Sequence, residues 1–342
     1  MQPEFEHIFS LGRALLNLNA VGRLLRPWLL GALLLVPASF RAVPAAEQEA
    51  PPELPPAHMD VIYSSSLFRT VSKNDAIAAL RVWVETVSRN YGFLVDCHVA
   101  VAENVGEIKR RLQEGPISIV VLDPIEYFEL AGLGVLEPAF TGTRGKEDES
   151  LQYLLVTSRE SGMTTISGLH CKTLVIQISS RADLGRMWID VSLHDEGLGP
   201  LDRFFSSVRS VLTPSEAVLP VFFGRAGAGV VDRDSFEVMK EMNPQLGSRL
   251  RVLAVSPPVL NGIVCLDKRL VRYREDLRKG LRELHETPAG KQILMVFRSN
   301  RLKPVNAEEL ERMRTLCTKY RRISSESAAQ QETHPNGRGE GL

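Results

Sequence analysis

Apolar positions recur along the chain with two different periods, and each period predicts one kind of element. Apolar side chains at every third or fourth position predict a helix over residues 74–90. Alternation of apolar and polar side chains predicts a strand over 93–101, and the continuous apolar run at 117–122 predicts a central strand buried on both faces. The succession of strands and helices over residues 59–131 therefore predicts an α/β fold with a mostly parallel sheet.

The second half of the chain continues this alternation of short apolar strands and amphipathic helices. Thr213 with Glu216, and Asn306 with Glu309, have the spacing of capping boxes, which predicts that helices begin there. With 342 residues the chain is long enough for two lobes that each bury their own core. Further strands are predicted at 151–157, 173–178, 208–212, 227–231, 251–255 and 262–266, and further helices at 182–191, 232–242, 272–285 and from 288 and 306 onward.

The stretch at residues 173–187, TLVIQISSRADLGRM, joins a predicted buried strand to a predicted helix through two serines. The first backbone N–H groups of a helix have no partner within the helix, and the helix dipole is positive at that end. Hydroxyl groups and free N–H groups together hold an anion without a full positive charge. We therefore expect this turn to form one side of a ligand cleft.

Each polar residue of this turn also has a simpler interpretation. Ser180 and Asp183 fit a capping box, which by itself stabilises a helix by ~1 kcal/mol. Asp183 neutralises the dipole that an anion would need, whereas Arg181 could restore the balance through a bidentate contact with a phosphate or carboxylate. For Ser179 and Ser180 the sequence leaves ligand binding and helix capping both open.

The N-terminal segment differs from the rest of the chain. Arginines precede a short apolar run at 28–36, and small residues follow at 42–46. This arrangement is typical of a secretory signal, so residues 1–46 are predicted to be a signal peptide that directs export. Residues 47–57 are Pro-rich and are predicted to be an extended linker. The long segment before the apolar run leaves open whether the peptide is cleaved or retained as an anchor.

Composition narrows the classes of function. The chain has 41 basic and 41 acidic residues, and this balance argues against a nucleic-acid partner. Its 7 histidines are scattered, and no HExxH, GxSxG or Walker pattern occurs, so the sequence predicts neither an enzyme nor a bound cofactor or metal. The 4 cysteines lie far apart without a CxxC pair, and whether they form disulfides stays open.

The order of elements and several local sequences indicate a family. Residues 119–128 read IVVLDPIEYF, residues 234–246 read DSFEVMKEMNPQL, and residues 284–291 read LHETPAGK. With these segments the chain resembles, over residues 58–316, the periplasmic substrate-binding proteins of phosphate-ester, phosphonate and phosphite ABC importers. The resemblance implies a type 2 periplasmic binding fold, in which two lobes, each a mostly parallel sheet flanked by helices, are joined by a two-strand hinge.

This resemblance also implies how the chain is divided. The hinge strands are expected near 151–157 and 251–256. The expected segments are a signal peptide (1–46), a linker (47–57), the N-terminal part of lobe one (58–154), lobe two (155–252), the C-terminal part of lobe one (253–320) and a disordered tail (321–342).

The ligand site that the resemblance implies maps unevenly onto this chain. The family's turn after the first strand falls on residues 64–67, and its hydroxyl-rich turn in lobe two begins at Ser179. That turn departs from the family at 181–183, and an acidic residue common in the family is replaced by Gly227. Asp123 is most simply a helix N-cap, and Tyr127 could face either the cleft or the core. The predicted ligand-binding residues are Ser65, Ser66, Asp123, Tyr127, Ser179, Ser180, Arg181 and Asp232.

The function that follows from the resemblance is solute binding. It implies an exported, periplasmic, monomeric protein without a cofactor that captures a small oxyanion such as a phosphonate, phosphite or phosphate and delivers it to an ABC permease. The departures at 181–183 and at Gly227 leave an alternative open. In that alternative the chain is an orphan periplasmic binding protein for a different small ligand and signals to a membrane sensor.

Overall fold

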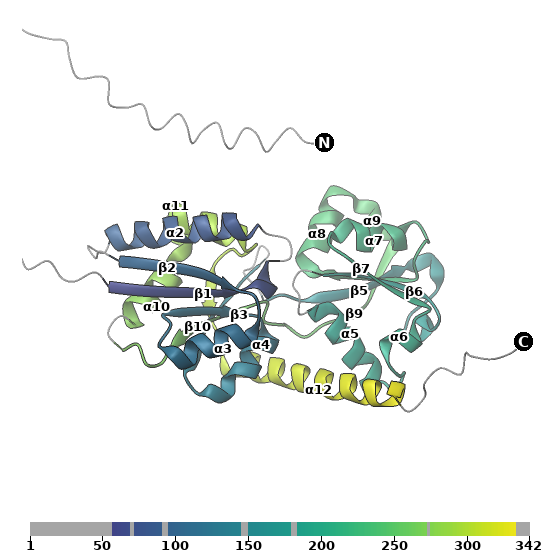
Figure 1. The fold of residues 1–342 in the computed structure, drawn as a ribbon. Helices are drawn as coiled ribbons and strands as arrows, with labels where there is room; N and C mark the ends of the chain where they lie inside the picture. Colours follow the sequence, from purple (N-terminus) through teal and green to yellow (C-terminus); the bar gives the residue numbers. More distant parts are fainter. Residues whose placement is uncertain are drawn as a thin grey trace, which may run out of the picture. The chain divides into compact units, whose positions relative to one another are not determined.

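The computed structural model describes residues 57–68, 72–90, 95–144, 150–178, 183–271 and 274–332 (Figure 1). The predicted signal peptide at 1–46 and the predicted linker at 47–57, apart from its last residue, lie outside these residues. The same holds for residues 333–342 of the predicted tail.

The first lobe is built on a six-stranded sheet with the strand order β11-β4-β10-β3-β1-β2. β1 pairs in parallel with both β2 and β3, whereas β10 pairs antiparallel with β3 and β4, and β11 with β4. The strands are β1 (Ala57–Ser64), β2 (Val95–Ala102), β3 (Ile119–Leu122), β4 (Leu136–Gly142), β10 (Ile263–Asp267) and β11 (Leu302–Pro304).

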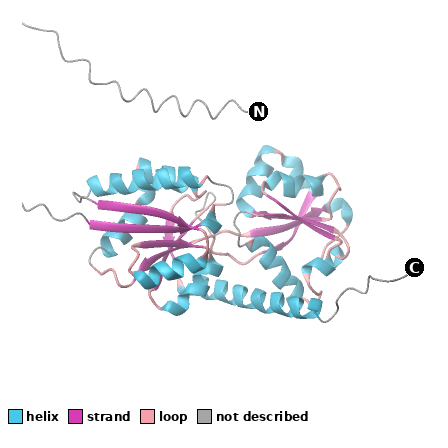
Figure 2. Ribbon diagram, in the orientation of Figure 1, coloured by secondary structure: helices cyan, strands magenta, loops and turns pink. Residues whose placement is uncertain are grey.

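Helices cover both faces of this sheet (Figure 2). α2 and α11 lie against one face, where Leu80, Ile293 and Leu294 join one buried cluster, and α3 and α4 lie against the other. Short 3₁₀ turns follow β1 (η2, Ser65–Leu67), α4 (η3, Ala131–Leu133) and α10 (η6, Leu284–Glu286). The helices are α2 (Lys73–Asn90), α3 (Val105–Glu114), α4 (Pro124–Leu130), α10 (Arg274–Arg282) and α11 (Pro288–Val296).

The second lobe is built on a five-stranded sheet with the order β7-β6-β8-β5-β9. Helices again flank it, and α7 packs on β8, β6 and β5. Its strands are β5 (Tyr153–Ser158), β6 (Thr173–Gln177), β7 (Ser207–Val211), β8 (Ala228–Asp232) and β9 (Leu250–Val255). Its helices are α5 (Leu184–Asp195), α6 (Leu201–Phe204), α7 (Pro214–Phe222), α8 (Arg233–Met242) and α9 (Pro244–Arg249), and it also holds the 3₁₀ turns η4 (Arg159–Ser161) and η5 (Ser167–Leu169).

Both sheets are mixed, whereas the sequence predicts mostly parallel sheets. β5 and β9, the strands expected to form the hinge, pair with each other antiparallel, with Leu154 opposite Val255. β5 carries the chain into the second sheet and β9 carries it out, so the two strands must run in opposite directions. After its return the chain adds β10 antiparallel to β3, with Val264 opposite Val121. These antiparallel pairs thus follow from the route of the chain, which crosses from the first lobe to the second and back. No local sequence pattern encodes that route.

The C-terminal helix α12 (Ala307–Glu332) continues well beyond residue 320, where the sequence predicts a disordered tail to begin. Its contacts explain the additional order. Ile323 is buried, and Arg321 donates from Nη2 to the carbonyl oxygen of Ile125 (3.3 Å) and to Glu129 Oε1 (3.4 Å) on α4. The helix also contacts α5 of the second lobe. The structure thus describes residues 321–332 as the end of α12, whereas the sequence predicts a disordered tail from residue 321.

The described residues contain no helix long and apolar enough to cross a membrane. Cys97, Cys171, Cys265 and Cys317 are all free thiols, and Cys265 and Cys317 are buried. Burial raises the pKa of the Cys317 thiol to about 12.

Candidate functional site

The carboxyl ends of β1 and β3 lie side by side, because the two strands are neighbours and parallel. β1 runs directly into the 3₁₀ turn η2, and Ser64 at its N-cap accepts a hydrogen bond from the backbone N–H of Ser66 (3.2 Å). β3 runs directly into Asp123 and α4. The serine turn formed by Ser64, Ser65 and Ser66 therefore lies beside Asp123, and all four residues are at most 4% exposed.

The side chain of Glu126, one turn into α4, occupies the serine turn. Its Oε1 accepts a hydrogen bond from the Ser64 hydroxyl (2.6 Å), and its Oε2 accepts one from the Ser66 hydroxyl (3.0 Å). The backbone N–H of Asp123 also donates to Oε2 (3.1 Å). Two hydroxyl groups and one N–H group thus hold both oxygens of a carboxylate, which is the donor set that an oxyanion requires.

Asp123 and Glu126 form a capping box at the start of α4. Asp123 Oδ1 accepts from the backbone N–H of Glu126 (3.0 Å), and Pro124 occupies the first helical position, where its missing N–H costs nothing. Burial raises the pKa of Asp123, and hydrogen bonds from backbone N–H groups and Ser66 offset this in part. Burial and the neighbouring Asp123 both raise the pKa of Glu126. Two carboxyl groups therefore share a poorly solvated position.

Two predicted site residues of the first lobe have other environments. The hydroxyl of Ser65 donates to the carbonyl oxygen of Glu103 (3.0 Å). Tyr127 is 5% exposed, meets Phe128 edge to face with ring centroids 5.2 Å apart, and belongs to the main hydrophobic cluster. Burial, together with nearby Cys265, raises the pKa of Tyr127. Of the two orientations left open for Tyr127, the structure has the one that faces the core.

Asp232 of the second lobe caps α8, and its carboxylate is fully engaged by protein groups. It accepts from the backbone N–H and the hydroxyl of Ser235 (both 2.8 Å) and from Gln177 Nε2 (2.9 Å). Its own N–H donates to Gln177 Oε1 (3.1 Å). Asp232 and Gln177 are 4% and 2% exposed, so this pair ties the ends of β8 and β6 together inside the lobe.

Ser179, Ser180 and Arg181 lie outside the described residues. The helix that follows them begins later than the sequence predicts, because its N-cap is Asp183 and not Ser180. Asp183 has φ 42° and ψ 57°, in the left-handed region, and its side chain accepts from the backbone N–H of Arg186 (3.3 Å). The first turn of α5 therefore has a carboxylate of its own at the positive end of the dipole.

Gly227, which stands at a position that is often acidic in the family, has a steric reason to be glycine. A Cβ atom at this position would lie 2.5 Å from Cβ of Lys172. Its carbonyl oxygen accepts a hydrogen bond from Thr157 Oγ1 (2.7 Å), which fixes it against β5. An acidic side chain is excluded here unless Lys172 moves.

Sequence reasoning missed Glu126 and Gln177. Glu126 carried a readable signal, since Asp-Pro-Ile-Glu has the spacing of a capping box with proline at its second position. Gln177 carried none, because its role depends on the pairing of β6 with β8, 55 residues away in the chain. The described part of the chain has no group of three or more His, Cys, Asp or Glu side chains that could hold a metal ion.

Comparisons with protein families and with curated proteins show what this chain is similar to. The model of a family described as "ABC transporter, phosphonate, periplasmic substrate-binding protein" matches residues 68–310. Comparison with curated proteins gave no match.

Solved structures share the fold at low sequence identity. XAC2383 from Xanthomonas citri, bound to ATP, aligns with a TM-score of 0.56 at 17% identity, over 79% of this chain and 98% of that chain. Its chloride-bound form gives 0.56 at 16% identity, over 79% and 99%. PA3383, a binding protein component of an ABC phosphonate transporter from Pseudomonas aeruginosa, gives 0.49 at 14% identity, over 81% and 94%. The similarity to XAC2383 establishes the two-lobed α/β fold and nothing about the ligand.

Proposed function

Because the chain belongs to the family of periplasmic substrate-binding proteins of phosphonate ABC transporters, we propose that it captures a small phosphonate-, phosphite- or phosphate-like oxyanion between its lobes for delivery to an ABC permease. Proteins of this family are solute-binding components of transporters and not enzymes. The family is periplasmic, and the signal pattern at residues 1–46 supplies the export signal for this chain. The mature protein acts as a monomer.

The observation that carries this proposal is the carboxylate held by the turn after β1. The hydroxyls of Ser64 and Ser66 and the N–H of Asp123 donate to Glu126. A phosphonate offers acceptor oxygens of the same kind, and hydrogen bonds to charged acceptors are about twice as strong as neutral ones. In the loaded protein the oxyanion of the ligand takes these donors, and the Glu126 side chain leaves the turn.

The second lobe completes the site from the turn that follows β6. Ser179, Ser180 and Arg181 provide hydroxyl groups and one guanidinium, and together with the serine turn they contact the ligand only when the lobes close. Ser65, Tyr127 and Asp232 support the elements around the site. In this proposal lobe one comprises residues 58–154 and 253–320, lobe two comprises 155–252, and β5 with β9 forms the hinge.

A thermal-shift screen of the full chain tests this function. Phosphate, phosphite, methylphosphonate, sulfate, acetate and ATP form the panel, with ATP included because XAC2383 was solved with it. A true ligand at ~100 times its dissociation constant adds ~2.7 kcal/mol to the free energy of unfolding. If no phosphorus oxyanion raises the melting temperature, the proposed ligand class is wrong.

A serine pair supplies the matched control for that screen. Ser66→Ala removes one of the three donors and should weaken oxyanion binding about tenfold, since a hydrogen bond to a charged group contributes ~1.5 kcal/mol or more. Ser248→Ala removes an exposed hydroxyl of α9 that donates to the Gln245 carbonyl (3.1 Å), and it should leave binding unchanged. Equal affinities in the two variants would exclude the serine turn from the site.

The paired carboxyl groups favour a second candidate. Asp123 and Glu126 place two acidic groups where an anion must bind, and such a site suits a ligand that carries an ammonium group. In this reading the chain is a sensory binding protein that signals its ligand to a membrane partner. Simple alkylamines added to the thermal-shift screen distinguish the two candidate functions. Stabilisation by amines and not by oxyanions would favour the second candidate.

A further inference from the structure

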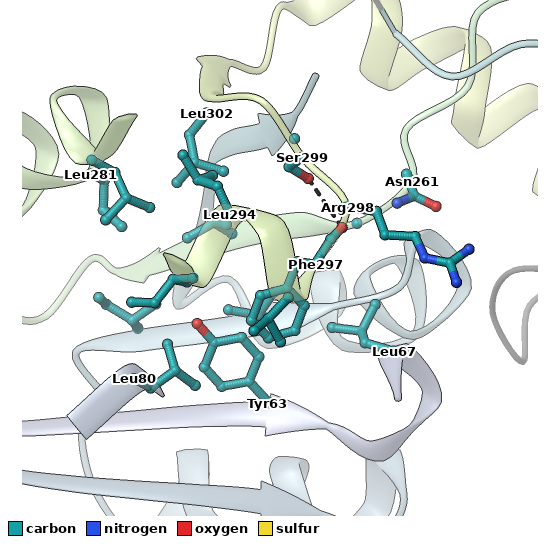
Figure 3. A pocket seen from close by; sticks show the side chains of 18 of the residues that line it. Tyr63, Leu67, Leu80, Asn261, Leu281, Leu294, Phe297, Arg298, Ser299 and Leu302 are labelled. Atoms are coloured by element: carbon teal, nitrogen blue, oxygen red, sulfur yellow. Dashed lines mark hydrogen bonds between the residues drawn. The ribbon is translucent and has the colours of Figure 1, made fainter. Parts of the chain in front are cut away.

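A cavity of about 110 Å³ lies in the first lobe between the sheet and the helices α2 and α11 (Figure 3). It is on the opposite face of the sheet from Glu126, because Tyr63 and Ser64 are successive residues of β1 and point to opposite faces. Its deep end is lined by buried aliphatic side chains. These are Leu80, Ile119, Val121, Leu281, Ile293 and Leu294.

The hydroxyl of Tyr63 is the notable polar group of this cavity. Tyr63 is 8% exposed, and its ring stacks on Phe297 with centroids 5.3 Å apart and an interplanar angle of 11°. Within the described part of the chain its hydroxyl forms no hydrogen bond, and it remains accessible from the cavity. Figure 3 shows the ring extending into the cavity beneath Leu294. A donor is therefore available inside an apolar space.

The mouth of the cavity is cationic. Arg144 and Arg298 line it together with Asn261, and all three are at least partly exposed. Arg144 Nε is buried and has no hydrogen-bond partner among the residues that the structure describes. Arg298, with φ 50°, forms no ion pair within the same ranges, and Figure 3 shows it with Asn261 at the opposite end of the cavity from the Tyr63 hydroxyl. Two uncompensated guanidinium groups at an apolar opening favour an anion.

We propose that this cavity is a second ligand site, independent of the interlobe site, for a small amphipathic carboxylate with a second polar atom at its far end. The carboxylate of the ligand lies at Arg144 and Arg298, and a hydrocarbon body of about six carbons fills the apolar middle of the cavity. The polar atom at the far end of the ligand accepts a hydrogen bond from the Tyr63 hydroxyl. The size agrees with an engineered cavity of ~150 Å³ that admits benzene. A simple void would instead leave the buried Nε of Arg144 without a hydrogen-bond partner.

Isothermal titration of the full chain with para-hydroxybenzoate and benzoate tests the site. Both acids carry the same ring and carboxylate, and only the first has a far oxygen that can pair with Tyr63. We expect para-hydroxybenzoate to bind about tenfold more tightly than benzoate. If neither acid binds at millimolar concentration, or if the two bind equally, the proposal is wrong.

Variants separate the contributions of the two ends. Tyr63→Phe keeps the ring and should remove the tenfold preference while benzoate binding stays. Arg144→Gln should weaken both acids at least tenfold, whereas Arg209→Gln, on the exposed strand β7 of the other lobe, should change neither.

A filled cavity provides the control for location. Leu302→Phe, at a partly exposed lining position on β11, should abolish binding of both acids while binding of an interlobe oxyanion ligand persists. Binding of the acids that survives this change would place them elsewhere and overturn the proposal. Failure of the phosphonate screen would remove only that comparison, because the titrations with the two acids do not depend on an interlobe ligand.

Discussion

Glu126 shows how one residue sets the charge of a site. Its carboxylate satisfies two hydroxyls and one N–H, so the turn is stable without a ligand, yet it stands next to a second buried carboxyl group on Asp123. Burial raises the pKa of both groups, and the charge of Asp123 adds to the effect on Glu126. Any anion that enters must either displace Glu126 or bind more readily as this group becomes protonated.

Glu126→Gln should make stability less dependent on pH. The pKa values of Glu126 and Asp123 are raised in the folded state, so their contribution to stability is full in acid and is lost as pH rises through the folded pKa values. Glutamine keeps the capping box and one acceptor but removes the repulsion. Above that range the variant should gain roughly 1 kcal/mol relative to the parent. Urea unfolding from acid to neutral pH measures the free energy of unfolding of both proteins. Parallel pH profiles would contradict the expected difference.

Asp267 and Arg269 hold the end of α3 against β10 with the opposite pH dependence. Arg269 Nε donates to Asp267 Oδ1 (2.9 Å), and its Nη1 donates to the carbonyl oxygen of Leu112 (2.9 Å). Burial by itself would raise the pKa of Asp267, but hydrogen bonds from Arg269 and from the N–H of Ile117 keep that pKa below its usual range. The stabilisation is therefore present at neutral pH and is lost as pH falls through the folded pKa.

Arg269→Met should lower the free energy of unfolding by about 2 kcal/mol at neutral pH, because it leaves the 1% exposed Asp267 without its cation. The cost of leaving a buried carboxylate without its cation is usually larger, but water screens part of it here because Arg269 is itself partly exposed. Arg110→Met on α3 is the control, as its exposed pair with Glu114 spans 3.8 Å and should contribute under ~1 kcal/mol. Chemical denaturation at neutral and acidic pH compares them, and equal losses at both pH values would refute the linkage.

At the scale of elements, helix starts are where the sequence is most informative. Thr213 accepts from the N–H of Glu216 (3.4 Å) while Glu216 bonds back to the Thr213 N–H (3.2 Å), as the capping-box spacing predicts. Asn306 also caps α12 (2.7 Å), but Glu309 turns away to Lys303 (2.6 Å). Local spacing thus places the helix, and tertiary contacts decide what the third residue does.

Gly290 at the start of α11 should not tolerate a side chain. An added Cβ would lie 1.8 Å from the carbonyl oxygen of Leu284, which is backbone and cannot move aside. Gly290→Ala should therefore cost at least ~2 kcal/mol and displace α11 from its packing on α2. Gly132→Ala, where no atom lies within 4 Å of the added carbon, should be nearly neutral. Thermal unfolding of the two variants is the measurement, and similar melting temperatures would contradict this account.

At the scale of the whole molecule, α12 connects the two lobes through its buried side chains. Met313 and Cys317 are each 2% exposed and belong to a cluster that includes residues of both lobes. Lys319 also pairs with Asp195 on α5 (2.7 Å), but both groups are substantially exposed. The apolar contacts, and not the ion pair, should therefore hold the helix in place.

Met313→Ala should lower the free energy of unfolding by about 3 kcal/mol, the usual cost of emptying a buried methionine site. Lys319→Ala should cost under ~1 kcal/mol, as expected of an exposed pair. Differential scanning calorimetry of both variants gives the comparison. A larger loss for Lys319→Ala would show that charge pairing across the lobes outweighs packing.

The sequence by itself determined the α/β class, most of the strands and helices, the capped helix starts and the family, because these depend on local periodicity and short spacings. It missed β4 and β11, which pair through long-range contacts, and it did not reveal that β5, β9 and β10 run antiparallel to their neighbours. Strand direction follows from the route of the chain between lobes, which no local segment contains.

Only the tertiary structure decided the chemistry of the candidate site. Ser64 and Glu126 are 62 residues apart, and their hydrogen bond exists because β1 and β3 are parallel neighbours. In the same way, the pairing of β6 with β8 brings Gln177 to Asp232 and turns a predicted ligand residue into an internal cap. A hydroxyl or carboxylate is visible in the sequence, but its partner is set by the sheet, and the partner decides whether the group remains available to a ligand.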